Sequence, residues 1–397
     1  MTATIKVLFA CLLFACFLLA LLSPQMVRAQ EKTDAAVEDC AQPDKTVKLK
    51  LAPVAAKPEV AKPEVAKSEA KPAQANEGDL ARWFELQTAT LSTRYRYIEN
   101  SAGAMTFNHM QHNEAFKGRF KFDAAGRYSV NAGLFTGNSF TGSWNNTGAG
   151  TGKPVTNLYL KQLYFSAKPV RGVELQYGGL YILRGESTEI TSYDNDGFIM
   201  GERITLNRPK ELFFDEVSVT YAHLGDLNNP DVTERLDRLD QSNYHQFLVS
   251  KKIGKRAVVS ADYTFQSGVE TLRQGVKLNT PELRVIDSLR FENYQRTDIS
   301  PDYGFAVAGE KTLFKRLNLA GGYARIDPNY GGLNFDRFNT GKRIYVTGTY
   351  VISPEFSVST FATRAVANDF ALSNRNRFDL VFSYNLLKSL QRLGAFK

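Results

Sequence analysis

Basic side chains recur at every second position in two stretches of the sequence. The stretch RYRY carries Arg94 and Arg96, the stretch FKGRFK carries Lys117, Arg119 and Lys121, and a later stretch adds Arg203. Alternate residues of an extended strand project from the same face, so these cations are predicted to lie along one wall. Fixed positive charge along a wall attracts anions and repels cations. The pattern therefore predicts electrostatic selection between anions and cations, and no covalent chemistry.

The side chains needed for catalysis or tight metal binding are sparse. His109 and His112 form HMQH, a spacing that two metal ligands can use, but no cysteine or acidic cluster completes a site nearby. The sequence has no GxSxG motif, no haem-attachment motif and no phosphate-binding loop. His223, near a predicted strand end, is only a weak candidate for a Ser/His hydrolase site. We therefore predict no catalytic residue, no metal and no cofactor.

The elements that position the cations alternate apolar and polar residues. In LYFSAKPVRGVELQYG, Leu163 and Phe165 alternate with polar residues before a turn, and Leu175 and Tyr177 do so after it. This pattern predicts a β-hairpin with one apolar face. The other face of most such segments carries charges, hydroxyls and amides, which a dry protein core would exclude. A wall between water and lipid accommodates both faces.

The connections between these segments alternate in length. Short turns are predicted at 123–126, 168–171, 207–210, 254–256, 314–316 and 353–355, and long loops at 98–113, 137–155, 183–196, 224–243, 267–301, 327–342 and 368–376. Short turns at one end and long loops at the other are typical of transmembrane β-barrels. The pattern predicts an all-β, transmembrane antiparallel β-barrel of about fourteen strands, with twelve to sixteen compatible with the same segments.

The first 29 residues are predicted to be a secretory signal peptide. Lys6 precedes an apolar run from Val7 to Leu22, and a small-residue cleavage signal ends at Ala29. An uncleaved membrane anchor is the alternative. Two of the three cysteines lie in the apolar run, so the mature chain keeps only Cys40 and cannot form an intrachain disulfide.

Residues 30–80 are predicted to be a disordered linker. The motif AKPEV occurs twice within a stretch rich in Ala, Lys, Pro and Glu, which cannot bury a core and favours extended spacing. The linker is either a tether that reaches peptidoglycan in the periplasm or a passive connection.

Composition excludes two other classes of protein. The net charge is +8, but acids and bases are interspersed, which argues against a nucleic-acid partner. Beyond the N-terminus no apolar run is long enough to span a bilayer as a helix. The chain has 18 Tyr and 27 Phe, and several tyrosines lie near predicted strand ends, as an interfacial aromatic girdle requires.

The signal peptide, the aromatic hairpins, the short turns with long loops and the apolar last strand (378–386) together resemble the porin-type outer-membrane β-barrels of Gram-negative bacteria. The resemblance covers residues 81–387 and leaves 388–397 as a C-terminal tail. It is architectural, and no residue-level motif accompanies it. It implies location in the bacterial outer membrane, contact with its lipid and lipopolysaccharide, and a homotrimer as one oligomeric state to test.

The resemblance also implies a passive channel for small polar solutes. In general porins an inward-folded loop sets carboxylates against a basic wall. We expect the six cations above to be pore-lining and a constriction loop to carry Glu186, Glu189, Asp194 and Asp196. The channel would then lean toward anions; the alternative is that the cations bind lipopolysaccharide or pair across strands. A loop-plugged barrel that acts as an envelope anchor or adhesin is the second interpretation, and an outer-membrane enzyme is the least favoured.

Overall fold

The computed structural model describes residues 82–140, 142–186, 198–207, 213–225, 228–283, 285–298, 303–327, 341–367 and 375–394. The predicted signal peptide and linker, and the acidic residues Glu189, Asp194 and Asp196, lie outside these ranges. None of the helices within these ranges combines the length and the apolar character needed to cross a bilayer.

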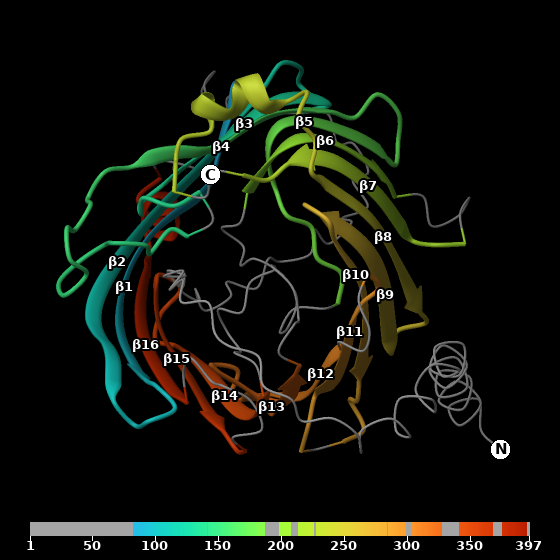
Figure 1. Ribbon diagram of the computed structural model, residues 1–397. Helices are drawn as coiled ribbons and strands as arrows, with labels where there is room; N and C mark the ends of the chain where they lie inside the picture. Colours follow the sequence, from blue (N-terminus) through green and yellow to red (C-terminus); the bar gives the residue numbers. More distant parts are fainter. Residues whose placement is uncertain are drawn as a thin grey trace, which may run out of the picture. The chain divides into compact units, whose positions relative to one another are not determined.

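Sixteen antiparallel strands form a closed barrel (Figure 1). Each strand pairs with its neighbours in sequence, and β1 pairs with β16 to close the ring. The prediction of an all-β antiparallel barrel is therefore confirmed. The strands are β1 (Phe84–Glu99), β2 (Met105–Lys121), β3 (Tyr128–Phe135), β4 (Tyr159–Ala167), β5 (Val173–Tyr181), β6 (Phe198–Leu206), β7 (Glu216–His223), β8 (Tyr244–Ile253), β9 (Ala257–Gln266), β10 (Val269–Asn279), β11 (Ser288–Arg296), β12 (Tyr303–Leu313), β13 (Leu317–Ile326), β14 (Gly341–Val351), β15 (Phe356–Ala365) and β16 (Asn376–Asn385).

The strand count exceeds fourteen because one predicted loop contains a hairpin. The segment 267–301 was expected to be a single long loop, but it forms β10 and β11. Likewise, the expected loop 98–113 lies mostly within β1 and β2, which leave only 100–104 between them. Polar residues are frequent in both segments, which suits a wetted strand face, and this polarity made them look like loops.

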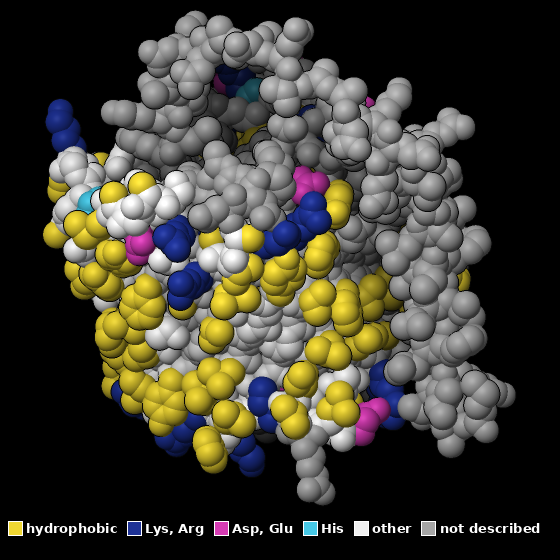
Figure 2. Space-filling view, turned by 60° about the horizontal axis from the view of Figure 1, so that its bottom comes forward, with side chains coloured by type: hydrophobic (Ala, Val, Ile, Leu, Met, Phe, Trp, Pro, Cys, Tyr) yellow, Lys and Arg dark blue, Asp and Glu magenta, His cyan; other side chains and the backbone are white. Residues whose placement is uncertain are grey.

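The two faces of the barrel wall differ sharply in chemistry. One cross-strand row on the inner face is polar throughout and runs Gln176, Arg203, Thr220, Gln246, Thr264, Thr271. On the outer face, exposed large apolar side chains include Phe165, Leu175 and Ile204. Figure 2 shows this apolar surface as a band of hydrophobic side chains with basic side chains at its edges. Period-two alternation within each strand is sufficient to produce both faces.

The two ends of the barrel also differ. We call the end with the connections 122–127, 168–172, 254–256, 314–316 and 352–355 the turn end, and the opposite end the loop end. In the 314–316 turn, Phe314 and Lys315 have φ of 52° and 58°. Two successive residues with positive φ are typical of the tight turns whose twist matches that of a β-hairpin. The loop end holds the 3-10 helix η1 (Thr233–Arg238) in the β7–β8 connection.

A short helix follows the last strand. β16 ends at Asn385, and α4 spans Leu386–Arg392, where a strand to residue 386 and then a tail were expected. The Asn385 side chain accepts a hydrogen bond from the Lys388 backbone N–H (3.0 Å) and so caps the helix. Arg392 pairs with Glu355 in the β14–β15 turn (2.9 Å), and α4 contacts β1. The helix therefore lies at the turn end of the strands that close the barrel.

Two residues of β14 allow a direct test of the two faces. Val346 is exposed on the outer face, whereas Thr349 projects inward between Asn318 and Ser359. We expect Val346→Arg to destabilise the lipid-embedded barrel by about 2–4 kcal/mol, because a charged side chain at mid-depth loses its hydration. Thr349→Arg is the matched control and should cost clearly less, since its neighbours on the inner face are polar. Urea unfolding in lipid vesicles, followed by heat-dependent migration in gels, measures both; equal losses would contradict the assignment of faces.

Candidate functional site

The inner wall holds a three-residue ionic cluster where the barrel closes. Arg96 of β1 binds both carboxylate oxygens of Asp379 on β16, with Nε–Oδ1 and Nη2–Oδ2 distances of 2.8 Å. Arg377 donates to the same carboxylate through Nη2 (2.6 Å). All three side chains are at most 2% exposed. We call this group the seam cluster; it carries two guanidinium charges for one carboxylate.

Arg94 holds a loop against the inner wall. Its guanidinium lies 4.4 Å from the centroid of the Trp144 ring and donates to Gln111 of β2. Gln111 in turn donates to the Trp144 carbonyl (2.8 Å). Trp144 belongs to the β3–β4 connection, so this cation joins the loop to β1 and β2. Arg94 itself is fully buried.

The cations of β2 form a separate group nearer the turn end. Lys121 pairs with Glu85 of β1 (3.2 Å), and Arg119 lies 4.0 Å from the same carboxylate. Lys117 lies 5.4 Å from the Phe135 ring. In the strand register Lys117 is opposite Thr88, whereas Gln111 is opposite Arg94. The register thus separates Lys117, Arg119 and Lys121 from Arg94 and Arg96, where the sequence suggested one continuous ladder.

Arg203 lies on a different part of the wall, in β6. It donates to Thr220 Oγ1 (2.9 Å) and Gln176 Oε1 (3.2 Å), its neighbours in the polar row. Its guanidinium also lies 4.9 Å from the centroid of the Tyr181 ring. Each of these partners is electrically neutral.

Further charged groups lie on β9–β12, of which β10 and β11 fall within the expected loop 267–301. Arg273 and Asp262 form a buried pair in which Nε lies 2.6 Å from Oδ1. Glu310 accepts from Arg290 (3.0 Å) and Lys277 (3.2 Å). Alternation in VETLRQGVKLN, with Arg273 and Lys277 four positions apart, was the signal that could have identified these residues as inward-facing.

The β5–β6 connection leaves the wall and crosses to β8 and β9. Figure 1 shows the segment after β5 turning into the ring. Gln246 of β8 donates to the Leu183 carbonyl (3.1 Å), and the Glu186 backbone N–H donates to Ser260 Oγ of β9 (2.6 Å). Gly185 packs so closely that an added Cβ would lie 2.3 Å from Ser260 Oγ. The start of the predicted acidic loop, Glu186 included, is therefore fixed to the inner wall.

The two histidines of HMQH lie in β2, and their expected place in a long loop is wrong. His109 pairs in register with the inward-facing Arg96, whereas His112 pairs with Thr93 on the opposite face. His112 Nδ1 contacts Glu114 (3.0 Å). Residues three apart in a strand project from opposite faces, so these imidazoles cannot bind one ion together.

The seam cluster should dominate the stability of barrel closure. Asp379→Asn removes the carboxylate that Arg96 and Arg377 share, and loss of one member of a buried ionic group costs about 3–5 kcal/mol. Glu85→Gln removes a half-exposed carboxylate and should cost about 0–1 kcal/mol. The free energy of unfolding in detergent micelles, from urea titration, measures both variants. A loss for Asp379→Asn no greater than that for Glu85→Gln would contradict this role.

Comparisons with known proteins identify the fold. No protein-family model and no curated protein matches the sequence. Among solved structures, a mutant of the Rh. blastica porin is 10% identical with a TM-score of 0.51, and the match covers 76% of this chain and 99% of that porin. OmpF of Salmonella typhi, solved in complex with daunomycin, is 12% identical with a TM-score of 0.53, covering 78% of this chain and 99% of that one. The chain therefore has the fold of the bacterial porins.

Proposed function

We propose that the protein is an outer-membrane channel for the passive diffusion of small polar solutes. The observation that carries this proposal is the closed sixteen-stranded barrel with a polar inner row and an apolar outer face. A polar inner face suits a water-filled lumen, and closure satisfies every strand edge where lipid offers no hydrogen-bond partner. The apolar band would contact outer-membrane lipid and lipopolysaccharide.

The β5–β6 connection is the proposed constriction loop. The contacts of Leu183 and Glu186 with β8 and β9 support an inward course for its first residues. Glu189, Asp194 and Asp196 follow in sequence and would add carboxylates within the lumen. The pore-lining role proposed for the cations on β1, β2 and β6 would then set positive charge against this loop and produce a transverse field.

The proposed selectivity is a preference for anions over cations. Arg96 and Arg377 share one carboxylate in the seam cluster, Glu310 has two cationic neighbours, and Arg203 donates to the neutral side chains of Thr220 and Gln176. Positive charge fixed in a narrow, low-dielectric passage raises the local concentration of anions.

Planar-bilayer recordings test both parts of the proposal. Lys117→Glu combined with Lys121→Glu should lower the anion-to-cation permeability ratio by about tenfold, because the potential of the wall changes sign locally. Lys252→Glu combined with Lys255→Glu is the matched control, since it makes the same charge change in the β8–β9 hairpin, away from the proposed pore-lining cations of β1, β2 and β6. Absence of any conductance would contradict the proposed channel function. A preference for cations in the natural sequence would contradict only the proposed anion selectivity.

Gly185 provides a test of the constriction loop. Gly185→Val should force the loop away from Ser260 and change the single-channel conductance, because no space exists for the new side chain. Ser260→Ala removes only the hydrogen bond to Glu186 and should have a smaller effect. Conductance identical to that of the natural sequence in Gly185→Val would mean that this segment does not narrow the pore.

A loop-plugged barrel that acts as an envelope anchor or adhesin is the second candidate function. Inward-facing apolar residues on β11–β15 are buried, although an open aqueous lumen would expose them; they are Tyr294, Ala306, Ala308, Ala324, Ile326, Tyr345 and Phe361. This cluster favours a lumen that is filled beside these strands. Liposome swelling with sugars of graded size distinguishes the functions, since a plugged barrel admits none of them.

The remaining proposals concern the ends and the assembly of the chain. We propose no enzymatic activity. Residues 1–29 would direct secretion, and residues 30–80 would link the barrel to the periplasm, with peptidoglycan as a partner of this linker. Deletion of residues 31–78 with unchanged envelope attachment would exclude the tether. Cross-linking in native membranes would show whether the barrel forms a homotrimer.

A further inference from the structure

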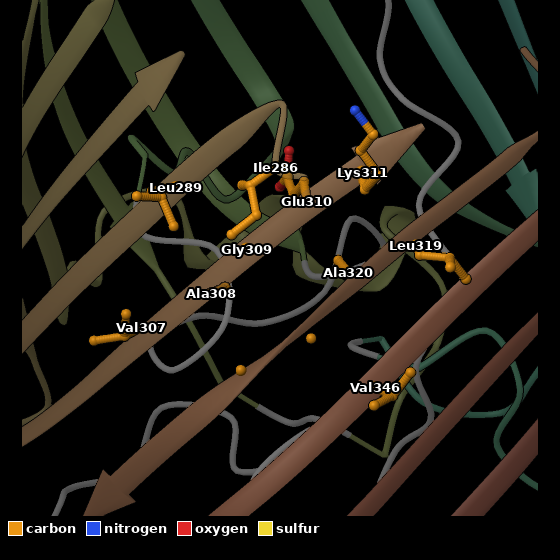
Figure 3. Close-up of a pocket in the computed structure, with 12 residues that line it drawn as sticks. Ile286, Leu289, Val307, Ala308, Gly309, Glu310, Lys311, Leu319, Ala320 and Val346 are labelled. Carbon is orange, nitrogen blue, oxygen red and sulfur yellow. The ribbon is translucent and has the colours of Figure 1, made fainter. Parts of the chain in front are cut away.

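A shallow apolar groove lies on the outer face of the barrel across β11–β14. It has a volume of about 470 Å³. In Figure 3, Gly309 lies between Ile286 and Leu289 on one side and Leu319 and Val346 on the other. The groove ends near Lys311, two residues before β12 reaches its turn.

A cross-strand glycine pair creates the groove. Gly309 of β12 is directly opposite Gly321 of β13, and the same row continues to Leu289 on β11 and to Val346 on β14. Many outer-face positions carry large apolar side chains, such as Phe165, Leu175 and Ile204. The two paired glycines have no side chains, which leaves a depression over β12 and β13. A Cβ at position 309 would find Ile286 Cδ1 at 3.5 Å, an ordinary contact. Neither crowding nor backbone strain therefore requires glycine at position 309.

The turn end beneath the groove combines apolar and basic side chains that project beyond the strands. Phe314 is 90% exposed and Val285 is 80% exposed, whereas such side chains normally avoid water. Lys315 and Arg316 are exposed in the same turn as Phe314. Apolar and basic residues together at this level suit the interface of a bilayer with anionic headgroups.

We propose that this groove binds one acyl chain of an anionic phospholipid, whose phosphate lies on Lys315 and Arg316. The occupant must be apolar and narrow along the strands and negatively charged at the turn end. Lys311 already pairs with Asp287 (2.7 Å). The cations proposed to bind the phosphate are therefore those of the turn, Lys315 and Arg316. From Lys311 to Val307 the groove follows four residues of strand, about 13 Å, a length that part of an acyl chain spans. A second copy of the barrel would match the apolar groove but has no need of the two cations.

The inference rests on the proposed insertion of the barrel in a bilayer, but it is independent of conduction. Native mass spectrometry of the full chain in detergent, titrated with phosphatidylglycerol or phosphatidylcholine, measures the binding. We expect one phosphatidylglycerol to be retained in preference to phosphatidylcholine. Lys315→Gln combined with Arg316→Gln should weaken that binding about 25-fold, because each basic residue near an anionic headgroup contributes about a factor of five.

Gly309→Leu tests the groove itself. The substitution fills the groove with a side chain that β-strands accept. Loss of the contacts of two acyl-chain methylene groups alone should weaken binding about tenfold or more. Lys252→Gln combined with Lys255→Gln removes the same charge from the β8–β9 hairpin at the same end of the barrel and should leave affinity unchanged. Heat-dependent gel migration verifies that each variant is folded.

Each of the following results would overturn the proposal. Unchanged lipid binding in Gly309→Leu would show that the groove is not the site. An equal loss of phosphatidylglycerol affinity in Lys252→Gln combined with Lys255→Gln would show that the lipid is held by general electrostatic adsorption. A change of oligomeric state in Gly309→Leu would assign the groove to a second copy of the chain. A barrel that fails to float with phosphatidylcholine vesicles would contradict the proposed location as well, whereas a barrel that floats but shows no preference for phosphatidylglycerol contradicts the groove alone.

Discussion

The pairing of β1 with β16 is the constraint on which the rest of the structure depends. Ten residues of each strand match in register, from Thr90 with Asn385 to Glu99 with Asn376. Without this pairing both strands would present unsatisfied backbone groups, which lipid cannot solvate. Because the ring is closed, every strand has two partners, and the alternation of side chains becomes a division between lumen and exterior. The polar row, the outer apolar band and the position of each inward loop all follow from that division.

Burial of charge inside this wall follows a consistent pattern. Inward-facing arginines are held by carboxylates, amides or aromatic rings, as with Arg273 on Asp262 and Arg94 on Trp144. An unpaired guanidinium would be costly away from water, so each such contact offsets part of its desolvation. The same contacts fix loops and strands relative to one another. The side chains that stabilise the wall therefore include cations for which a pore-lining role is proposed, and a substitution made to change that proposed selectivity would also change stability.

Much of the architecture could be predicted from the sequence because a barrel strand has a simple signature. Phe165, Leu175 and Tyr177 were correctly placed on the outer face by alternation alone. β10 and β11 were missed because their polar side chains outweigh a weak apolar alternation. Register could not be predicted, since it depends on pairing between strands, and it is register that separates Lys117 from Arg94. The contact of Glu186 with Ser260 joins residues 74 apart in sequence, which no local pattern specifies.

The seam cluster also has a consequence for the order of folding. Arg96 and Asp379 are separated by 283 residues, so their ion pair cannot form until almost the entire chain has been made and arranged. Contacts at such separation pay the full entropy of loop closure and form late. Most other strand pairs join neighbours in sequence and can form as hairpins. We therefore expect the barrel to exist first as an open, curved sheet whose two edges carry complementary charge, and that complementarity would guide the edges into register as the sheet closes.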